Sequence, residues 1–408
     1  MRRKFFVLKR GNPVAVNLEA HIILPEDSNG APKSGRLPVR HAGDILGTVK
    51  IITSCDVAFD VDLSFEGHIR TRRDTHTCRL TKELQVQYLH ANRSVRDERL
   101  QASIIHLPFK FTIPNQLVSV RADIHPDFLK LCPSTDACRS SENTSFKHHQ
   151  TWISYHIKIS RVCADNFLPS SPLNKPREIL IVPFSYAEPP IEINYHPHQY
   201  KCSNTKALNS AFLNRLQGHL TLSAAEPDPI NLLTEAPRAS TTVSLKVSFS
   251  PENQSRVDVG QWRLVVQSRL RSRTFTTICK LHQAPTTTAS HADPFLQMME
   301  HKERWEIREC GQLAWKREQR AGDDGAFKAI WTAVLSVPAS VSKELLPTFL
   351  NMLSARQYAL VIRVSVADLR TWRALELAIP LQLIYHDHVK SLEEKFNFAS
   401  SGQNDNEW

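Results

Sequence analysis

The 408-residue sequence contains no apolar run near the ~20 residues that a helix needs to cross a bilayer, so we expect no transmembrane segment. Its first residues, MRRKFFVLKRG, are basic, but their apolar run of four residues is too short for the central region of a signal peptide. Glycine is scarce, with 12 residues against 24 prolines, which indicates many bounded loops and few long helices. These absences favour a cytoplasmic protein.

Paired cysteines are also absent. The eight cysteines stand alone, without C-x-x-C spacing, at positions 55, 78, 132, 138, 163, 202, 279 and 310. Several lie in segments with the pattern of strands, where a thiol packs as a small apolar side chain. We therefore expect reduced thiols rather than a disulfide framework.

Sequence signatures of catalysis and of metal binding are missing as well. The patterns G-x-S-x-G, H-E-x-x-H and G-x-x-x-x-G-K-[ST] do not occur. Zinc requires about four converging ligands, which neither histidine group provides. These groups are His196 and His198 with Cys202, and His386 with His388. We expect a protein that is not an enzyme and that holds no metal or cofactor.

What the sequence does contain is strict alternation of apolar and polar residues, most clearly at residues 57–69, VAFDVDLSFEGHI. Alternation puts the two sets on opposite faces of a strand, so the segment predicts an antiparallel strand with one face in a core. Its carboxylates, Asp60, Asp62 and Glu66, are then expected to face solvent as a hydrated surface rather than a cation site or catalytic pair. The glycine-bracketed turn at residues 43–47 is expected to lead into its hairpin partner.

The same pattern recurs along the chain, with roughly fourteen to sixteen short strands separated by turn residues and almost no helical period. Prolines at both ends of the segment 107–117 favour an edge strand or the end of a strand there. Residues 282–296 are expected to form a surface loop. The predicted fold is all-β, with two immunoglobulin-like antiparallel β-sandwich domains. The main predicted strands are residues 13–23, 84–89, 107–117, 152–160, 178–184, 243–249, 261–272, 326–337, 358–366 and 377–385.

A proline-rich segment separates the two halves. Residues 187–197, AEPPIEINYHP, have the composition of an extended, semi-rigid linker. We predict a first domain at residues 1–186, a linker at 187–204, a second domain at 205–388 and a polar tail at 389–408.

Four motifs, in this order along the chain, resemble those of the arrestin family. GDILG at 43–47 resembles the opening of arrestin amino-terminal domains, and LPFKFTIP at 107–114 resembles a later strand of the same domain. Tyr155 stands where a strand tyrosine is expected. In the second half, LPTF at 346–349 with Arg356 and Tyr358 is similar to fungal arrestin-like proteins of the α-arrestin type.

The resemblance implies two arrestin-type sandwiches joined by a short linker. It also implies an adaptor that recognises cytoplasmic tails of membrane proteins, or an anionic membrane surface, in endocytic trafficking and signalling. Relatives of the α-arrestin type recruit a ubiquitin ligase through Pro-Pro-x-Tyr motifs, which the segments PPIE at 189–192 and PHQY at 197–200 do not match. The location implied is the cytoplasm, with peripheral association at the plasma membrane or endosomes.

Two basic clusters are candidate binding surfaces. The net charge of +10 favours anionic partners, and guanidinium forks suit phosphate on a cargo tail or a lipid headgroup. The spacing of two at 269, 271 and 273 predicts a row on the solvent face of a strand, or simply a charged face that opposes aggregation. The start of the chain would touch an anionic membrane or fray as a terminus. The candidates are Arg263, Arg269, Arg271, Arg273 and Lys280 for cargo, and Arg2, Arg3, Lys4, Lys9 and Arg10 for a membrane.

Two alternatives remain. A basic β-sandwich that binds nucleic acid would need aromatic residues interleaved with the basic row. The segment 261–280 offers Trp262 and Phe275, but Trp262 belongs to the inward set, so no nucleic acid is expected. A hydrolase with a dispersed active site is the other alternative.

Overall fold

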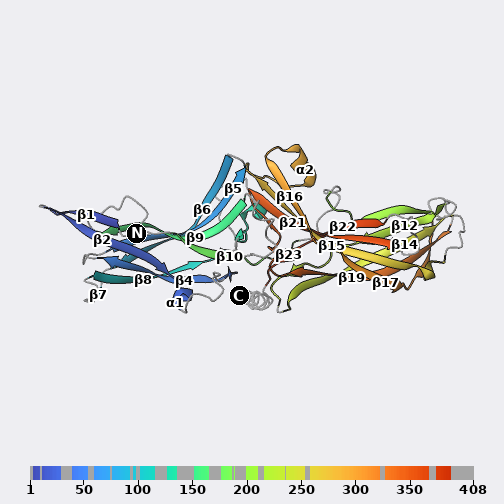
Figure 1. Ribbon diagram of the computed structural model, residues 1–408, viewed down its shortest axis with the longest axis horizontal. Helices are drawn as coiled ribbons and strands as arrows, with labels where there is room; N and C mark the ends of the chain where they lie inside the picture. The colour runs from blue at the N-terminus through green and yellow to red at the C-terminus, as the bar shows by residue number, and fades with distance from the viewer. Residues whose placement is uncertain are drawn as a thin grey trace, which may run out of the picture. The chain divides into compact units, whose positions relative to one another are not determined.

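The structure, a computed structural model, is nearly all β (Figure 1). The chain divides into two compact units, which we call the N-terminal unit (Met1–Phe184 with Asn351–Leu353) and the C-terminal unit (Ser185–Leu350 with Ser354–Trp408). The predicted linker lies mostly outside the described residues, and the first strand after it begins at Ser203, inside the range predicted as linker. The described residues are 3–9, 12–28, 39–53, 59–73, 76–91, 95–97, 102–114, 126–135, 151–164, 176–185, 188, 199–209, 216–234, 236–252, 258–321, 327–366 and 374–386.

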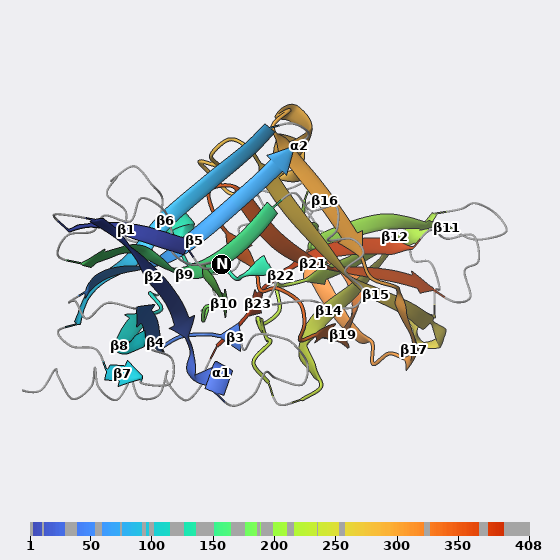
Figure 2. The same cartoon turned by 60° about the vertical axis from the view of Figure 1, so that its left-hand side comes forward.

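The N-terminal unit has two five-stranded sheets. The first, in the order β1-β2-β4-β8-β7, contains β1 (Arg3–Lys9), β2 (Asn12–Ile23), β4 (Asp44–Thr53), β8 (Ala102–Thr112) and β7 (Val95–Asp97). The second, in the order β3-β10-β9-β5-β6, contains β3 (Val39–Arg40), β10 (Arg177–Ile181), β9 (Thr151–Ala164), β5 (Phe59–Arg73) and β6 (His76–Ala91). All neighbours pair antiparallel except β3 and β10. Figures 1 and 2 both show β6, β5 and β9 side by side. Two short helices are α1 (Pro25–Ser28) and η1 (Pro126–Leu129).

The strand predicted at residues 57–69 is β5, and its apolar face is buried as expected. Val61, Leu63 and Phe65 have no exposed surface. The Phe65 ring lies 5.8 Å from that of Phe111 on β8, measured between centroids, so this face meets the other sheet in the core. Alternation therefore predicted the correct face.

The opposite face of β5 is less exposed than predicted. Asp60 is exposed, but Glu66 is 9% exposed, so the prediction that its carboxylate faces solvent is wrong. The strand has neighbours on both sides, and longer side chains cover its centre. Ser64 Oγ donates to Glu66 Oε1 at 2.9 Å, and Lys158 Nζ from β9 lies 3.7 Å from the same oxygen.

The predicted hairpin between residues 43–52 and β5 is also wrong. β4 pairs with β2 and β8 in the other sheet, and the hairpin partner of β5 is β6. The turn predicted at residues 43–47 is also misplaced: the chain bends at Gly43, which has φ +88°, and β4 already begins at Asp44. Gly47 lies opposite Phe109, where an added Cβ would stand 2.3 Å from the phenyl Cζ. This position therefore needs glycine because the Phe109 ring packs on the backbone.

The proline-flanked segment forms β8, which is open on one side as predicted for an edge strand. β8 pairs with β7 only at residues 102–104, so the rest of that side has no strand partner among the described residues. Two glutamines of β6 bind its backbone instead: Gln85 Oε1 accepts from the Thr112 N–H at 2.9 Å, and Gln87 Oε1 from the Lys110 N–H at 3.2 Å. Pro108, two residues earlier, has no N–H to satisfy. The two N–H groups of Lys110 and Thr112 are therefore occupied and do not lie open to a strand of another chain.

The C-terminal unit repeats this organisation. One sheet has the order β11-β12-β14-β19-β18, with β11 (Ser203–Asn209), β12 (Leu216–Ala224), β14 (Arg238–Pro251), β19 (Phe327–Ser342) and β18 (Lys316–Ala321). The other has β16 (Leu296–Lys302), β15 (Arg263–Thr277), β21 (Ser354–Val366) and β20 (Phe349–Leu350), with β17 (Glu306–Gln312) beside β15 and β22 (Leu375–Leu381) beside β21. A small parallel pair joins β13 (Ile230–Asn231) to β23 (Leu383–Ile384), and η5 (Val259–Gln261) precedes β15. The inward row predicted at 243–249 and the first three members of the row at 262–270 lie in one buried apolar cluster, including Leu245, Phe249 and Leu264. Leu270 is buried as well but is not part of this cluster.

The segment predicted as a surface loop at 282–296 contains a short helix, α2 (Thr287–Ala292), and packs on the outer face of β15. Thr286 caps the helix by accepting from the Ala289 N–H at 3.0 Å. Phe275, fully buried, forms a small apolar cluster with Leu296 and Ala355, against which Ala289 packs. The loop prediction is therefore right for residues 282–286 and 293–295 and wrong for residues 287–292, where the helix lies beside the apolar Phe275 on the outer face of β15. No helix in the part of the chain that the structure describes is long and apolar enough to cross a bilayer.

Candidate functional site

The motif residues that resemble arrestins in the N-terminal unit are packed in its core. Phe109, Phe111 and Tyr155 are at most 5% exposed. The Tyr155 hydroxyl donates to the Cys132 carbonyl at 2.6 Å, and burial raises the pKa of both the Tyr155 hydroxyl and the Cys132 thiol, the latter to about 12. A buried thiol with a raised pKa is not a nucleophile at neutral pH. These residues hold the fold together.

The motif residues of the C-terminal unit are equally internal. The Tyr358 hydroxyl donates to the Leu346 carbonyl at 2.6 Å and accepts from Arg356 Nε at 2.6 Å. Arg356 also donates to Thr274 Oγ1 at 3.1 Å and is 5% exposed. This buried network fixes the segment before β20 against β21, and again offers no accessible chemistry.

The predicted arginine row lies on the outward side of β15, but it is not a solvent face. Arg263 is the first residue of β15, and Lys280 follows the last residue of the strand by three positions; both are exposed. The side chains of Arg271 and Arg273 are only 13% and 10% exposed. The prediction that these two side chains face solvent is therefore wrong, because α2 and residues 199–200 pack over this end of the strand.

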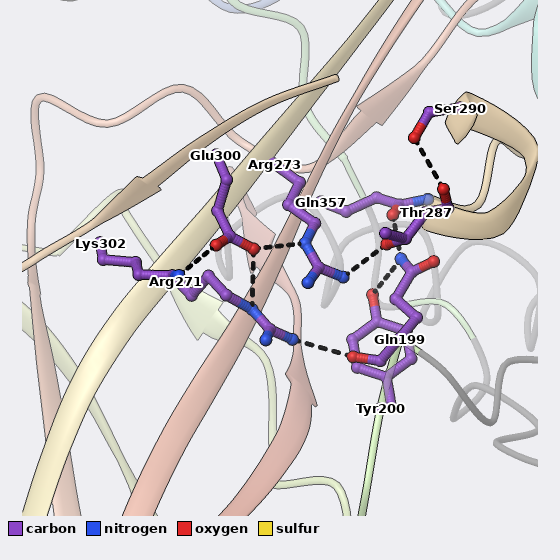
Figure 3. Close-up of polar contacts among 9 residues, drawn as sticks. All are labelled: Gln199, Tyr200, Arg271, Arg273, Thr287, Ser290, Glu300, Lys302 and Gln357. Carbon is purple, nitrogen blue, oxygen red and sulfur yellow. Dashed lines mark hydrogen bonds and ion pairs between the residues drawn. The ribbon is translucent and has the colours of Figure 1, made fainter. Parts of the chain in front are cut away.

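Arg271 and Arg273 converge with Lys302 on one carboxylate, that of Glu300 on the neighbouring strand β16 (Figure 3). Arg273 Nε donates to Glu300 Oε2 at 2.8 Å, Arg271 Nε lies 3.9 Å from the same oxygen, and Lys302 Nζ lies 2.5 Å from Oε1. We call these four residues the cationic cluster. Three cations share one carboxylate, which leaves a net charge of +2 at this place.

Hydrogen bonds from other segments hold the two arginines in place (Figure 3). Arg273 donates to Thr287 Oγ1 of α2 at 2.8 Å, and Arg271 donates to the Gln199 carbonyl at 2.8 Å. Gln199 donates to Gln357, which in turn donates to the Pro285 carbonyl at 3.2 Å. The guanidinium groups are therefore fixed in position, which favours bidentate recognition of a carboxylate or phosphate.

The pKa shifts follow from burial and charge. Burial and the neighbouring Arg273 lower the pKa of Arg271, against the raising effect of Glu300. Burial opposes ionisation of Glu300, but hydrogen bonds from Lys302 and Arg273 outweigh it and lower the pKa of its carboxyl. The cluster thus favours negative charge. Its four side chains supply three cations and one shared carboxylate, so an anion is the ligand that the local charge would attract.

Arg269, the first arginine of the row, makes a cation–π contact with an aromatic residue. Its guanidinium lies 4.0 Å from the centroid of the Trp305 ring, and Arg363 of β21 lies 4.9 Å from the same ring. Trp262 is 8% exposed and Phe275 is fully buried, so neither aromatic of the 261–280 segment is open for stacking. The sequence predicts a short strand at Trp305 and Ile307, but its alternation does not reveal that Trp305 contacts arginines of β15 and β21.

The remaining candidates are only partly described. Of the N-terminal cluster, Arg3, Lys4 and Lys9 belong to β1, which pairs with β2, so this part is not a frayed terminus. Arg2 and Arg10 lie outside the described residues. His196, His198 and His388 do so as well, while Cys202 and His386 are partly buried. Within the described residues no group of three or more His, Cys, Asp or Glu side chains is placed to hold a metal ion.

Among the residues that the structure describes, no disulfide involves Cys78, Cys132, Cys202, Cys279 or Cys310. Comparison with known proteins adds no identity. No model of a known protein family matches the chain, and a search of curated proteins found no match.

Proposed function

We propose that this chain is a non-enzymatic, arrestin-like adaptor that binds acidic, phosphate-bearing cytoplasmic tails of membrane proteins. The observation that carries the proposal is the cationic cluster, in which Arg271, Arg273 and Lys302 surround the single carboxylate of Glu300. The resemblance of the motif residues to arrestins supplies the class of partner, and the β-sandwich character agrees with it.

Binding in this proposal is an exchange of anions. A phosphate group carries more negative charge than a carboxylate and offers more acceptor oxygens, so it competes with Glu300 for the guanidinium groups. Lys302, whose side chain is 45% exposed, is the outermost cation and the first to meet an incoming tail.

Direct binding to the full-length chain tests the proposal. Phosphoserine tail peptides, their unphosphorylated versions and phosphatidylserine vesicles are compared by isothermal titration calorimetry and vesicle sedimentation. Phosphopeptide binding that weakens at least about tenfold in Arg271→Gln, the loss of one charged hydrogen-bonding partner, supports it. Lys316→Gln, an exposed cation on the other sheet of this unit, is the matched control and should leave affinity unchanged.

Two results would contradict the proposal. One is equal affinity for the phosphorylated and unphosphorylated peptides. The other is vesicle binding that exceeds peptide binding and does not depend on Arg271, which would place the partner in the membrane rather than on a tail. Because Arg271 is largely covered, circular dichroism of each variant must show the native spectrum before its affinity is interpreted.

A further inference from the structure

The outer face of the second sheet in the N-terminal unit carries a shallow recess of about 340 Å³. It is lined by His68, Ile69, Arg70, Arg79, Thr81, Trp152 and Ser154. These residues come from β5, β6 and β9, which lie side by side in Figures 1 and 2. The volume is at the lower end of the range of about 300–1,000 Å³ that is usual for small-ligand sites.

Strand register brings two arginines and a tryptophan into one row across this recess. Arg70 on β5 lies directly opposite Arg79 on β6 and, on its other side, opposite Trp152 on β9. Like charges directly opposite on neighbouring strands destabilise a sheet. Among the described residues neither arginine forms an ion pair with a carboxylate, and both are exposed. An anion bound between them would relieve this repulsion.

Trp152 gives the recess an aromatic surface. It is 43% exposed because it lies on the outer face of β9, whereas the next residue, Ile153, points into the core and is buried. The Arg70 guanidinium lies 5.6 Å from its ring centroid and therefore covers part of one side only. An exposed indole beside two guanidinium groups, neither with a carboxylate partner among the described residues, is a combination that can bind a base by stacking and its phosphate by charge.

The next row of the recess is polar and already partly engaged. His68 Nδ1 lies 3.0 Å from Thr81 Oγ1, and its Nε2 lies 3.2 Å from Glu66 Oε2. Ser154 Oγ lies 2.9 Å from His156 Nε2. Glu66 is four residues from Arg70 along β5, about 13 Å at the strand rise, so its charge is remote from the arginine pair. The hydroxyl groups at this end are placed to accept or donate hydrogen bonds to a sugar.

From this geometry we propose that the recess binds a nucleotide, with its base stacked on Trp152 and its phosphate between Arg70 and Arg79. A phosphorylated peptide would use the arginines alone and would leave the exposed indole without a role. The nucleotide is either free or part of a single strand, since both present the same base and phosphate.

Calorimetric titration of the full chain tests the site with adenosine monophosphate, adenosine, ribose 5-phosphate and a short single-stranded oligonucleotide. Adenosine monophosphate should bind more tightly than adenosine or ribose 5-phosphate, because each of these lacks one half of the recognised group. Trp152→Val should weaken its binding about 5- to 150-fold, the range measured for loss of base stacking. Arg79→Gln should weaken it as well and abolish the preference over adenosine.

Tyr88→Val is the matched control, because Tyr88 is a 78% exposed aromatic residue on the same outer face, opposite Asp62. It should leave nucleotide affinity unchanged. Tighter binding of the oligonucleotide than of adenosine monophosphate would identify a single strand as the source of the nucleotide, and equal binding would identify the free nucleotide.

The proposal is overturned if adenosine monophosphate and ribose 5-phosphate bind equally, or if a phosphoserine peptide binds as tightly as the nucleotide. It is also overturned if Trp152→Val and Arg79→Gln, with native circular dichroism, both bind like the parent chain. Arg79 is exposed, so its variant keeps the test decisive even if Trp152→Val does not fold.

Discussion

Replacement of Glu300 by glutamine is the sharpest perturbation of the cationic cluster, because it removes the one carboxylate and leaves three cations together. Arg273, with a side chain 10% exposed, loses a charged partner at 2.8 Å, and such hydrogen bonds contribute about 1.5–3 kcal/mol. Lys302 is half-exposed, so its pair contributes about 0–1 kcal/mol. We expect Glu300→Gln to lower the free energy of unfolding by about 2 kcal/mol, or ~4–8 °C in Tm for a domain of about 150–250 residues.

Inorganic phosphate should reverse this loss. If an external anion replaces Glu300, phosphate stabilises the variant more than the parent chain, and chloride at the same ionic strength does not. Intrinsic tryptophan fluorescence is a suitable probe of thermal unfolding, because four of the five tryptophans among the described residues, all but Trp152, lie in the C-terminal unit. Glu306→Gln is the matched control, since its partners Arg238 and Arg308 lie at 3.9 and 3.8 Å and are largely exposed.

The dependence of stability on pH tests the same interaction independently. The pKa of Glu300 is lowered from its ordinary value of 4.5, so its contribution to stability is present above that value and is lost as pH falls through the lowered pKa. The parent chain should therefore lose stability below pH 4.5 more steeply than Glu300→Gln. The reasoning is refuted if Glu300→Gln melts like Glu306→Gln, or if phosphate stabilises the variant and the parent equally.

Two further predictions concern the buried groups. Tyr358→Phe removes a hydroxyl that binds both Arg356 and Leu346 and should cost about 2–4 kcal/mol, whereas Tyr155→Phe removes the bond to Cys132 and should cost about 1 kcal/mol. Urea titrations followed by circular dichroism compare them, and equal costs would show that Arg356 adds nothing. Burial and the neighbouring His68 lower the pKa of His156 from 6.5, against Glu66, so the N-terminal unit should lose stability as pH falls below 6.5 through the lowered pKa. Melting of the parent and of His156→Gln between about pH 5 and 8 measures this, and identical pH profiles would exclude a role for His156.

The fold class could be predicted from the sequence because burial in a sandwich follows a period of two. Val61, Leu63 and Phe65 on β5 and Leu245 and Phe249 on β14 are all inside, as their alternation indicates. The sheet to which each strand belongs was harder to predict. The assignment of β4 to the sheet opposite β5 depends on pairing with β2 and β8, which are separated from it by loops and other strands. Alternation carries no information about which strand becomes a neighbour.

The candidate site could be located but not described from the sequence. The spacing of Arg269, Arg271 and Arg273 correctly puts them on one side of β15, opposite Leu264 and Leu270. Their cover comes from α2 and from residues 199–200, and their carboxylate from β16. None of these contacts lies within the strand's own sequence pattern, so the period of two could not reveal them.

One residue, Phe275, could have indicated from the sequence that another segment covers the arginine row. Phe275 continues the arginine row by the same spacing of two, and it is fully buried. An apolar aromatic residue on a face otherwise read as solvated indicates that another segment packs there, since exposure of a phenyl ring forfeits its burial energy. A segment that covers Phe275 also covers the adjacent arginines. Because an unpaired buried charge is costly, these arginines then need an anionic partner. Glu300 meets that requirement from within the chain. For this reason any external anion that binds Arg271 and Arg273 must compete with Glu300, and its apparent affinity must depend on how tightly that carboxylate is held.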